Sequence, residues 1–111
     1  MNVYYNVEIQ MAIGNEVTEN LLRQLEECVG ANDTARDEVE SYRAVLFFKS
    51  DVKPTDIRTR LKAILAMHNN RIHYIDVIFR WDTEINADRF VLWSDGTEKD
   101  YTGRIYFEED K

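Results

Sequence analysis

The sequence predicts a single α+β domain over residues 1–111, in which two helices cover one face of a mixed, mostly antiparallel sheet of about five strands. Apolar residues repeat at every second position in several segments and at helical spacing in two others. An Asp-Gly pair lies between two short apolar segments, which is a strong hairpin signal. A chain of 111 residues with 44% hydrophobic residues is long enough for one core.

The first two elements follow from a change of period. Residues 3–13 alternate between apolar and mostly polar positions, which predicts a strand with one face on the core. Residues 16–29 carry apolar side chains at helical spacing, and Gly30 stands where a helix commonly ends. Cys28 lies on or beside this apolar stripe, so we expect it to be a small buried side chain. Residues 31–37 are predicted to form a polar loop.

The middle of the chain predicts an inner strand followed by a second helix. Residues 42–48 are apolar at almost every position, as in a strand covered on both faces. Pro54 is suited to the first turn of a helix that ends near residues 69–70. The inner stripe of that helix is expected to consist of Ile57, Leu61, Ile64, Leu65 and His68.

Three further strands are predicted over residues 72–81, 90–93 and 101–107, the last two joined by the Asp95-Gly96 hairpin. The resulting order, β-α-β-α-β-β-β, has one strand fewer between the helices than the βαββαβ order of ferredoxin-like folds. A strand within residues 31–40 would restore that order. With both helices on one face, we expect an outer face that marks association. Its expected members are Tyr4, Asn6, Glu8, Gln10, Val45, Phe47, Trp93 and Tyr106.

Charge narrows the choice of partners. The net charge is -7 and the pI is about 4.8, so nucleic acid and anionic membranes are expected to be poor direct partners. Residues 15–40 carry a net charge of -6, residues 41–75 carry +5 and residues 76–111 carry -5. We see no transmembrane segment and no signal peptide, and one cysteine excludes an internal disulfide, so a cytoplasmic location is expected.

Catalytic and metal-binding patterns are missing from the sequence. His68 and His73 are its two histidines, and their spacing matches no metal-binding motif. No serine lies in a nucleophile elbow, and no glycine-rich loop precedes a helix. The acidic pairs fall in turns or near residue 110, where we expect solvent to leave the pKa values of the carboxylates unshifted. We therefore expect neither a catalytic site nor a metal or cofactor, and predict that the protein is not an enzyme.

The acidic segments are the first candidate for a functional surface. A carboxylate array can occupy a phosphate-binding groove, because arginine and lysine accept carboxylate and phosphate with similar geometry. The sequence therefore suggests a small binding protein that inhibits a basic, nucleic-acid-handling protein without touching nucleic acid itself. The expected partner-binding residues are Glu16, Glu19, Glu26, Glu27, Asp95, Glu98 and Asp100.

The basic second helix supports a different hypothesis. Its Arg58, Arg60 and Lys62 are suited to an anionic metabolite or signalling nucleotide, or to contact with another subunit of a homo-oligomer. In size, charge and lack of catalytic motifs, however, the chain resembles phage-encoded inhibitors of bacterial defence, including anti-CRISPR proteins, and toxin-immunity proteins. This resemblance covers no specific motif, and it implies a protein partner and the inhibitory role.

Overall fold

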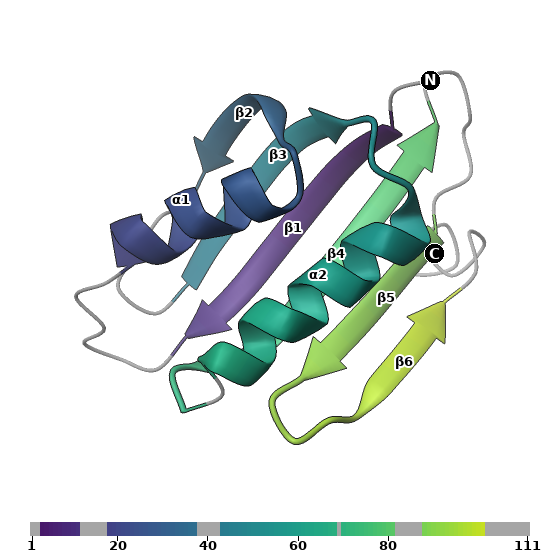
Figure 1. Cartoon of the computed structure of the whole chain (residues 1–111). Helices are drawn as coiled ribbons and strands as arrows, with labels where there is room; N and C mark the ends of the chain where they lie inside the picture. Colours follow the sequence, from purple (N-terminus) through teal and green to yellow (C-terminus); the bar gives the residue numbers. More distant parts are fainter. Residues whose placement is uncertain (1–2, 12–17, 38–42, 69, 82–87, 102–111) are drawn as a thin grey trace, which may run out of the picture.

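The computed structural model describes residues 3–11, 18–37, 43–68, 70–81 and 88–101, which form one six-stranded antiparallel sheet and two helices (Figure 1). This confirms the predicted α+β class, with six strands in place of about five and with only antiparallel pairs among the described strands in place of a mixed sheet. The elements, in chain order, are β1 (Val3–Met11), α1 (Thr18–Cys28), β2 (Asn32–Asp37), β3 (Arg43–Ser50), α2 (Pro54–Met67), β4 (Ile72–Trp81), β5 (Asp88–Trp93) and β6 (Glu98–Tyr101).

The strands lie in the order β2-β3-β1-β4-β5-β6, and every neighbouring pair is antiparallel. The first four strands and both helices thus have the ferredoxin-like order, and the β5–β6 hairpin extends the sheet beyond β4. Among the described residues, no helix combines the length and apolarity needed to cross a membrane.

The segment predicted as a loop contains β2, so that prediction was wrong for residues 32–37, whereas the alternative of a strand within residues 31–40 is confirmed. The strand is polar because it forms an edge of the sheet, where charged residues prevent pairing with other chains. Asp33 has a positive φ of 53°, and the pairing with β3 is irregular between Asn32 and Ala35. These irregularities leave no clean alternation in the sequence.

The closing hairpin also differs from the prediction. Its second strand begins at Glu98, and the predicted residues 102–107 lie outside the described part of the chain. The Trp93 N–H donates to the Thr97 carbonyl at 2.9 Å, so the loop contains three residues, 94–96. Gly96 has a φ of 91°, whereas Asp95 does not have a positive φ. Three-residue hairpin loops require a left-handed conformation at one position only, which explains why Gly96 alone adopts it.

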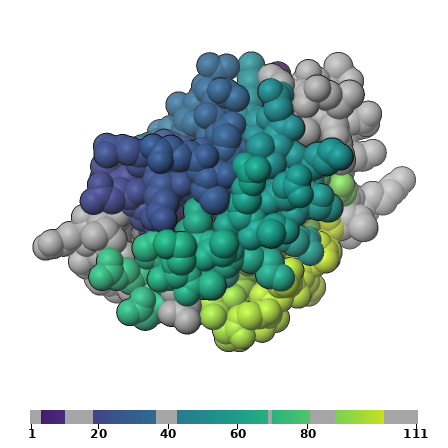
Figure 2. Space-filling view, in the orientation of Figure 1, coloured from purple at the N-terminus to yellow at the C-terminus, as the bar shows by residue number. Residues whose placement is uncertain are grey.

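The core lies between the sheet and the two helices. Figures 1 and 2 show α1 and α2 side by side on the same face, with α2 beside the β5–β6 hairpin. Alternate residues of β1 and β3, including Val7 and Leu46, are fully buried beneath the helices. Cys28 is half-buried at the margin of the core, not fully buried as predicted, because it is the last residue of α1.

Candidate functional site

The face of the sheet opposite the helices, called here the open face, carries the other half of each strand. Its residues form rows across the four central strands, because their registers are continuous up to Gln10 of β1, after which the pairing of β1 with β4 shifts. One row reads Lys49–Tyr4–Arg80 across β3, β1 and β4, and the next begins Phe47–Asn6–Ile78. This confirms the outer-face prediction for Tyr4, Asn6, Glu8, Gln10, Val45, Phe47 and Trp93, whereas Tyr106 lies outside the described residues.

Two carboxylates face each other at the centre of the open face. Glu8 on β1 lies directly opposite Asp76 on β4. Like charges in this position repel, and cations from the neighbouring strands offset the repulsion. The Arg43 Nη2 atom is 3.2 Å from Glu8 Oε1, and Arg89 donates to both Asp76 oxygens at 2.9 and 2.7 Å. The Tyr74 hydroxyl donates to Glu8 Oε2 at 2.8 Å.

This centre is hollowed. The hollow has a volume of about 230 Å³ and is lined by Asn6, Glu8, Arg43, Val45, Phe47, Asp76 and Ile78. Burial first, and the hydrogen bond to Glu8 second, raise the pKa of Tyr74 to about 12. Tyr74 therefore remains a neutral donor near pH 7. The hollow combines apolar walls with paired charges, which suits binding of another molecule.

The acids of α1 are partly neutralised by β2. Arg36 donates to both oxygens of Glu26 at 3.0 and 3.1 Å and to both oxygens of Glu19 at 2.7 Å. Arg36 lowers the pKa of Glu19, first through this hydrogen bond and then through its charge. Glu27 is exposed and makes no ion pair with any described residue, and Glu16 lies outside the described part.

The predicted acidic hairpin and the predicted basic helix contact each other. Lys62 on α2 lies 2.6 Å from Glu98 on β6, and Arg58 pairs with both Glu98 and Asp100. The Arg58 guanidinium also lies over the Phe90 ring, 4.5 Å from its centroid. The acidic hairpin of the first hypothesis and the basic helix of the second therefore form one cluster, in which the cations of α2 are paired with the carboxylates of β6.

Two predicted residues have local structural roles. Arg60 donates to the Cys28 carbonyl at 2.9 Å, where a cation also complements the C-terminus of α1. Asp95 accepts a hydrogen bond from the Thr97 N–H at 2.9 Å within the hairpin turn. Hydrogen bonds with Thr97 lower the pKa of Asp95. The turn therefore uses this carboxylate whether or not a partner binds it.

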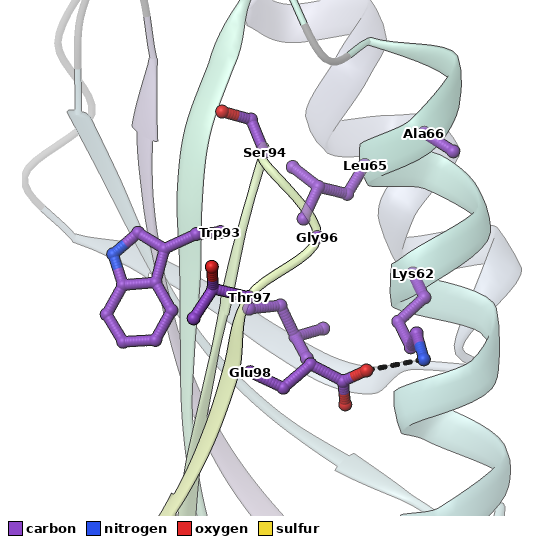
Figure 3. A pocket seen from close by; sticks show the side chains of 9 residues that line it. Lys62, Leu65, Ala66, Trp93, Ser94, Gly96, Thr97 and Glu98 are labelled. Atoms are coloured by element: carbon purple, nitrogen blue, oxygen red, sulfur yellow. Dashed lines mark ion pairs between the residues drawn. The ribbon is translucent and has the colours of Figure 1, made fainter.

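A second hollow of about 180 Å³ lies between α2 and the β5–β6 hairpin (Figure 3). Leu65 points into it, the indole of Trp93 points away from it, and the Lys62–Glu98 ion pair crosses one end. Its lining is mainly apolar, and its one cation is already paired.

The described residues contain no group of three or more histidine, cysteine, aspartate or glutamate side chains that could hold a metal ion. His68 Nε2 lies 3.3 Å from Gln24 Oε1, and His73 is exposed on β4. Cys28 Sγ lies 3.8 Å from the Arg60 carbonyl oxygen. These are ordinary contacts of partly exposed side chains and do not form a metal-binding or catalytic group.

Sequence reasoning missed the residues that complete each cluster. Arg36 falls in the segment predicted as a loop, and Arg43, Tyr74 and Arg89 meet their partners only across strands. The strand that the order of the elements suggested within residues 31–40 was the one available signal for Arg36. Comparison of the chain with protein families, characterised proteins and solved structures finds no significant match.

Proposed function

We propose that this protein is a non-enzymatic binding protein that inhibits a basic, nucleic-acid-handling protein through the carboxylates on its helix side. The observation that supports this most is the exposure of these acids. Glu19 is 58% exposed and Asp100 is 68% exposed, although both pair with arginines of the same chain. Glu27 and Asp95 are exposed and make no ion pair with a described residue.

The ion pairs within the chain do not prevent these carboxylates from binding the cations of a partner. Ion pairs between exposed side chains contribute about 0–1 kcal/mol, so an arginine-rich partner can replace the internal cation at small cost. A partner groove that normally holds phosphate presents several such cations together. The chain would then act by occupying the groove, in the cytoplasm, where nucleic-acid enzymes of this kind work.

Two charge reversals and a matched control test the proposal. The reversed pairs are Glu26→Lys with Glu27→Lys on α1, and Glu98→Lys with Asp100→Lys on β6. The control is Asp51→Lys, an exposed acid in the loop before α2 that makes no ion pair with a described residue. Tagged wild-type protein and variants are incubated with bacterial lysate and eluted along a salt gradient, and retained proteins are identified by mass spectrometry.

We expect the wild type and Asp51→Lys to retain the same basic nucleic-acid enzyme and both reversals to lose it. Added wild-type protein should also lower the activity of that enzyme. Retention of the partner by both reversed variants would refute the role of the acidic surface.

The hollow beside α2 favours a second candidate function, a homo-oligomer that binds an anionic small ligand. An anion would displace Glu98 from Lys62 while its apolar part enters the hollow lined by Leu65. Light scattering at tens of micromolar protein and a thermal-shift screen of nucleotides and organic phosphates test it. We expect an oligomer that a ligand stabilises, and a monomer that no compound stabilises would exclude this function.

A further inference from the structure

The open face of the sheet has a positive net charge, although the chain as a whole is negative. On the open face, the described side chains include five cations and three carboxylates, a net charge of +2. Since the whole chain has -7, all other residues together carry -9. The cations are Arg43, Lys49, Arg80, Arg89 and Lys99, and the carboxylates are Glu8, Asp33 and Asp76.

The three carboxylates do not dominate this face. Glu8 pairs with Arg43 and Asp76 with Arg89 at the centre of the sheet, and the exposed Asp33 on the edge strand lies 3.7 Å from Lys49. An exposed ion pair of this kind contributes about 0–1 kcal/mol, so a phosphate can replace Asp33 beside Lys49. The acids of the helix layer lie on the other side of the sheet, and packed layers are separated by about 10 Å. That distance is close to the screening length of about 8–10 Å at physiological salt, so the open face presents its local charge to a polyanion.

Aromatic side chains share the face with these cations. Phe47 on β3, the strand next to the β2 edge, is 41% exposed, and Tyr4 lies on the adjacent strand β1, one row away. Tyr4 is flanked in register by Lys49 and Arg80, and the Lys49 ammonium lies 5.3 Å from the centre of its ring. We define these four residues, Tyr4, Phe47, Lys49 and Arg80, as the basic aromatic strip.

We propose that the basic aromatic strip binds single-stranded nucleic acid. Aromatic side chains on an open antiparallel sheet stack on unpaired bases, and nearby cations contact the phosphates. Phe47 and Tyr4 provide two stacking surfaces on neighbouring strands, and Lys49 and Arg80 lie on either side of Tyr4. Asn6, which separates Phe47 from Ile78 in the next row, offers an amide that can hydrogen-bond base edges. Double-stranded nucleic acid lacks accessible base faces and does not fit this arrangement.

This inference goes beyond the proposed inhibitor function and uses the opposite side of the molecule. We expected nucleic acid to be a poor direct partner because the net charge of the whole chain is negative. That net charge does not describe the open face. Together, the two proposals describe a protein that contacts a basic partner with its helix side while its sheet contacts a single strand. Either proposal can fail without the other, because their variants share no residue.

Fluorescence anisotropy with labelled single-stranded DNA and RNA oligonucleotides of mixed sequence tests the strip at low salt. Loss of one stacking contact should weaken binding roughly 5- to 150-fold in Phe47→Ala. Phe47→Tyr should retain binding, and Phe47→Leu should lose it, because leucine keeps the apolar surface and removes the aromatic ring. Met67→Ala is the matched control, since Met67 is an exposed apolar residue, 65% exposed, on α2.

Salt dependence tests the cations separately. Lys49→Ala and Arg80→Ala should each reduce the slope of log affinity against log salt by about 0.7, the value for one phosphate contact on a single strand. Lys53→Ala, at the start of α2, should leave the slope unchanged. An absence of binding at low salt would overturn the proposal. Full binding by Phe47→Leu, or competition by duplex as strong as by single strands, would overturn it as well.

Discussion

Replacing Arg36 with alanine tests whether the edge strand β2 is attached to α1 through charge. The guanidinium forms a two-pronged contact with Glu26, at 3.0 and 3.1 Å, and reaches Glu19 at 2.7 Å. The sequence of β2, NDTARD, contains no large apolar residue that could hold the strand against the helix. Arg36 is therefore the main side-chain link between these two elements.

The size of the effect follows from exposure. The side chains of Arg36 and Glu26 are 27% and 19% exposed, so this charge-assisted pair is partly shielded from water. We expect its loss to reduce the free energy of unfolding by about 1–2 kcal/mol, and the melting temperature by roughly 5–10 °C. This range refers to the Glu26 pair alone, and the contact with Glu19 adds only a small part because the Glu19 side chain is 58% exposed and well solvated.

The effect should depend on pH. Arg36 lowers the pKa of Glu19 in the folded state, through the hydrogen bond first and its charge second. A carboxyl with a lowered folded pKa stabilises the fold above its unfolded pKa, and this stabilisation is lost as pH falls through the folded value. The difference between wild type and Arg36→Ala should therefore shrink below about pH 4.5, the ordinary value for glutamate.

Urea unfolding followed by circular dichroism measures the difference, with Arg23→Ala as the control. Arg23 contacts the same Glu19, but at 3.7 Å and with a side chain that is 61% exposed. Its removal should change stability by less than about 0.5 kcal/mol. If Arg36→Ala is as stable as the wild type, or if Arg23→Ala is equally destabilised, the attachment of β2 through Arg36 is refuted.

Three further predictions concern stability. Ser50, which is 1% exposed, donates to the Val29 carbonyl at 2.8 Å and accepts from the Val52 N–H at 3.0 Å. Ser50→Ala should cost about 1–3 kcal/mol in urea unfolding, and an equal stability to wild type would contradict this role. Gly30 has a φ of 65°, and an added Cβ would lie 3.3 Å from Val52, so Gly30→Ala should cost about 1–2 kcal/mol by the same measurement. Burial raises the pKa of Tyr5 to about 12, as it does for Tyr74, whereas unfolded tyrosine ionises near pH 10. Because the unfolded chain then loses protons first, stability should fall as pH rises from about 10 to about 12, and a flat profile in that range would exclude these shifts.

Local sequence patterns allowed prediction of the helices and strands that pack against the core. The alternation of residues 3–11, the helical spacing around Leu21 and Leu25, and Pro54 at the start of α2 each reflect a contact repeated along one element. Burial enforces such a period, so the α+β class and most boundaries could be predicted. The strand β2 was suggested only by the order of the elements and not by its own pattern, because an edge strand that carries Arg36 toward a helix has no apolar period to detect.

The sequence shows which residues are charged, but it does not show which charges lie next to each other in the fold. The acids at Glu98 and Asp100 and the cations at Arg58 and Lys62 were recognised as two separate surfaces, yet the fold places them in one cluster. Their sequence separation of about 40 residues leaves no local signal of the contact. Only strand order and register decide which charges neutralise each other.

The open face depends on the tertiary structure in the same way. The sequence predicted that residues such as Tyr4 and Phe47 point away from the helices, because side chains alternate along a strand. It did not predict that Lys49 and Arg80 flank Tyr4 across three strands, because register is set by pairing between distant segments. The period of the chain thus determined which residues face outward, and the order of the strands decided which of them form a surface together.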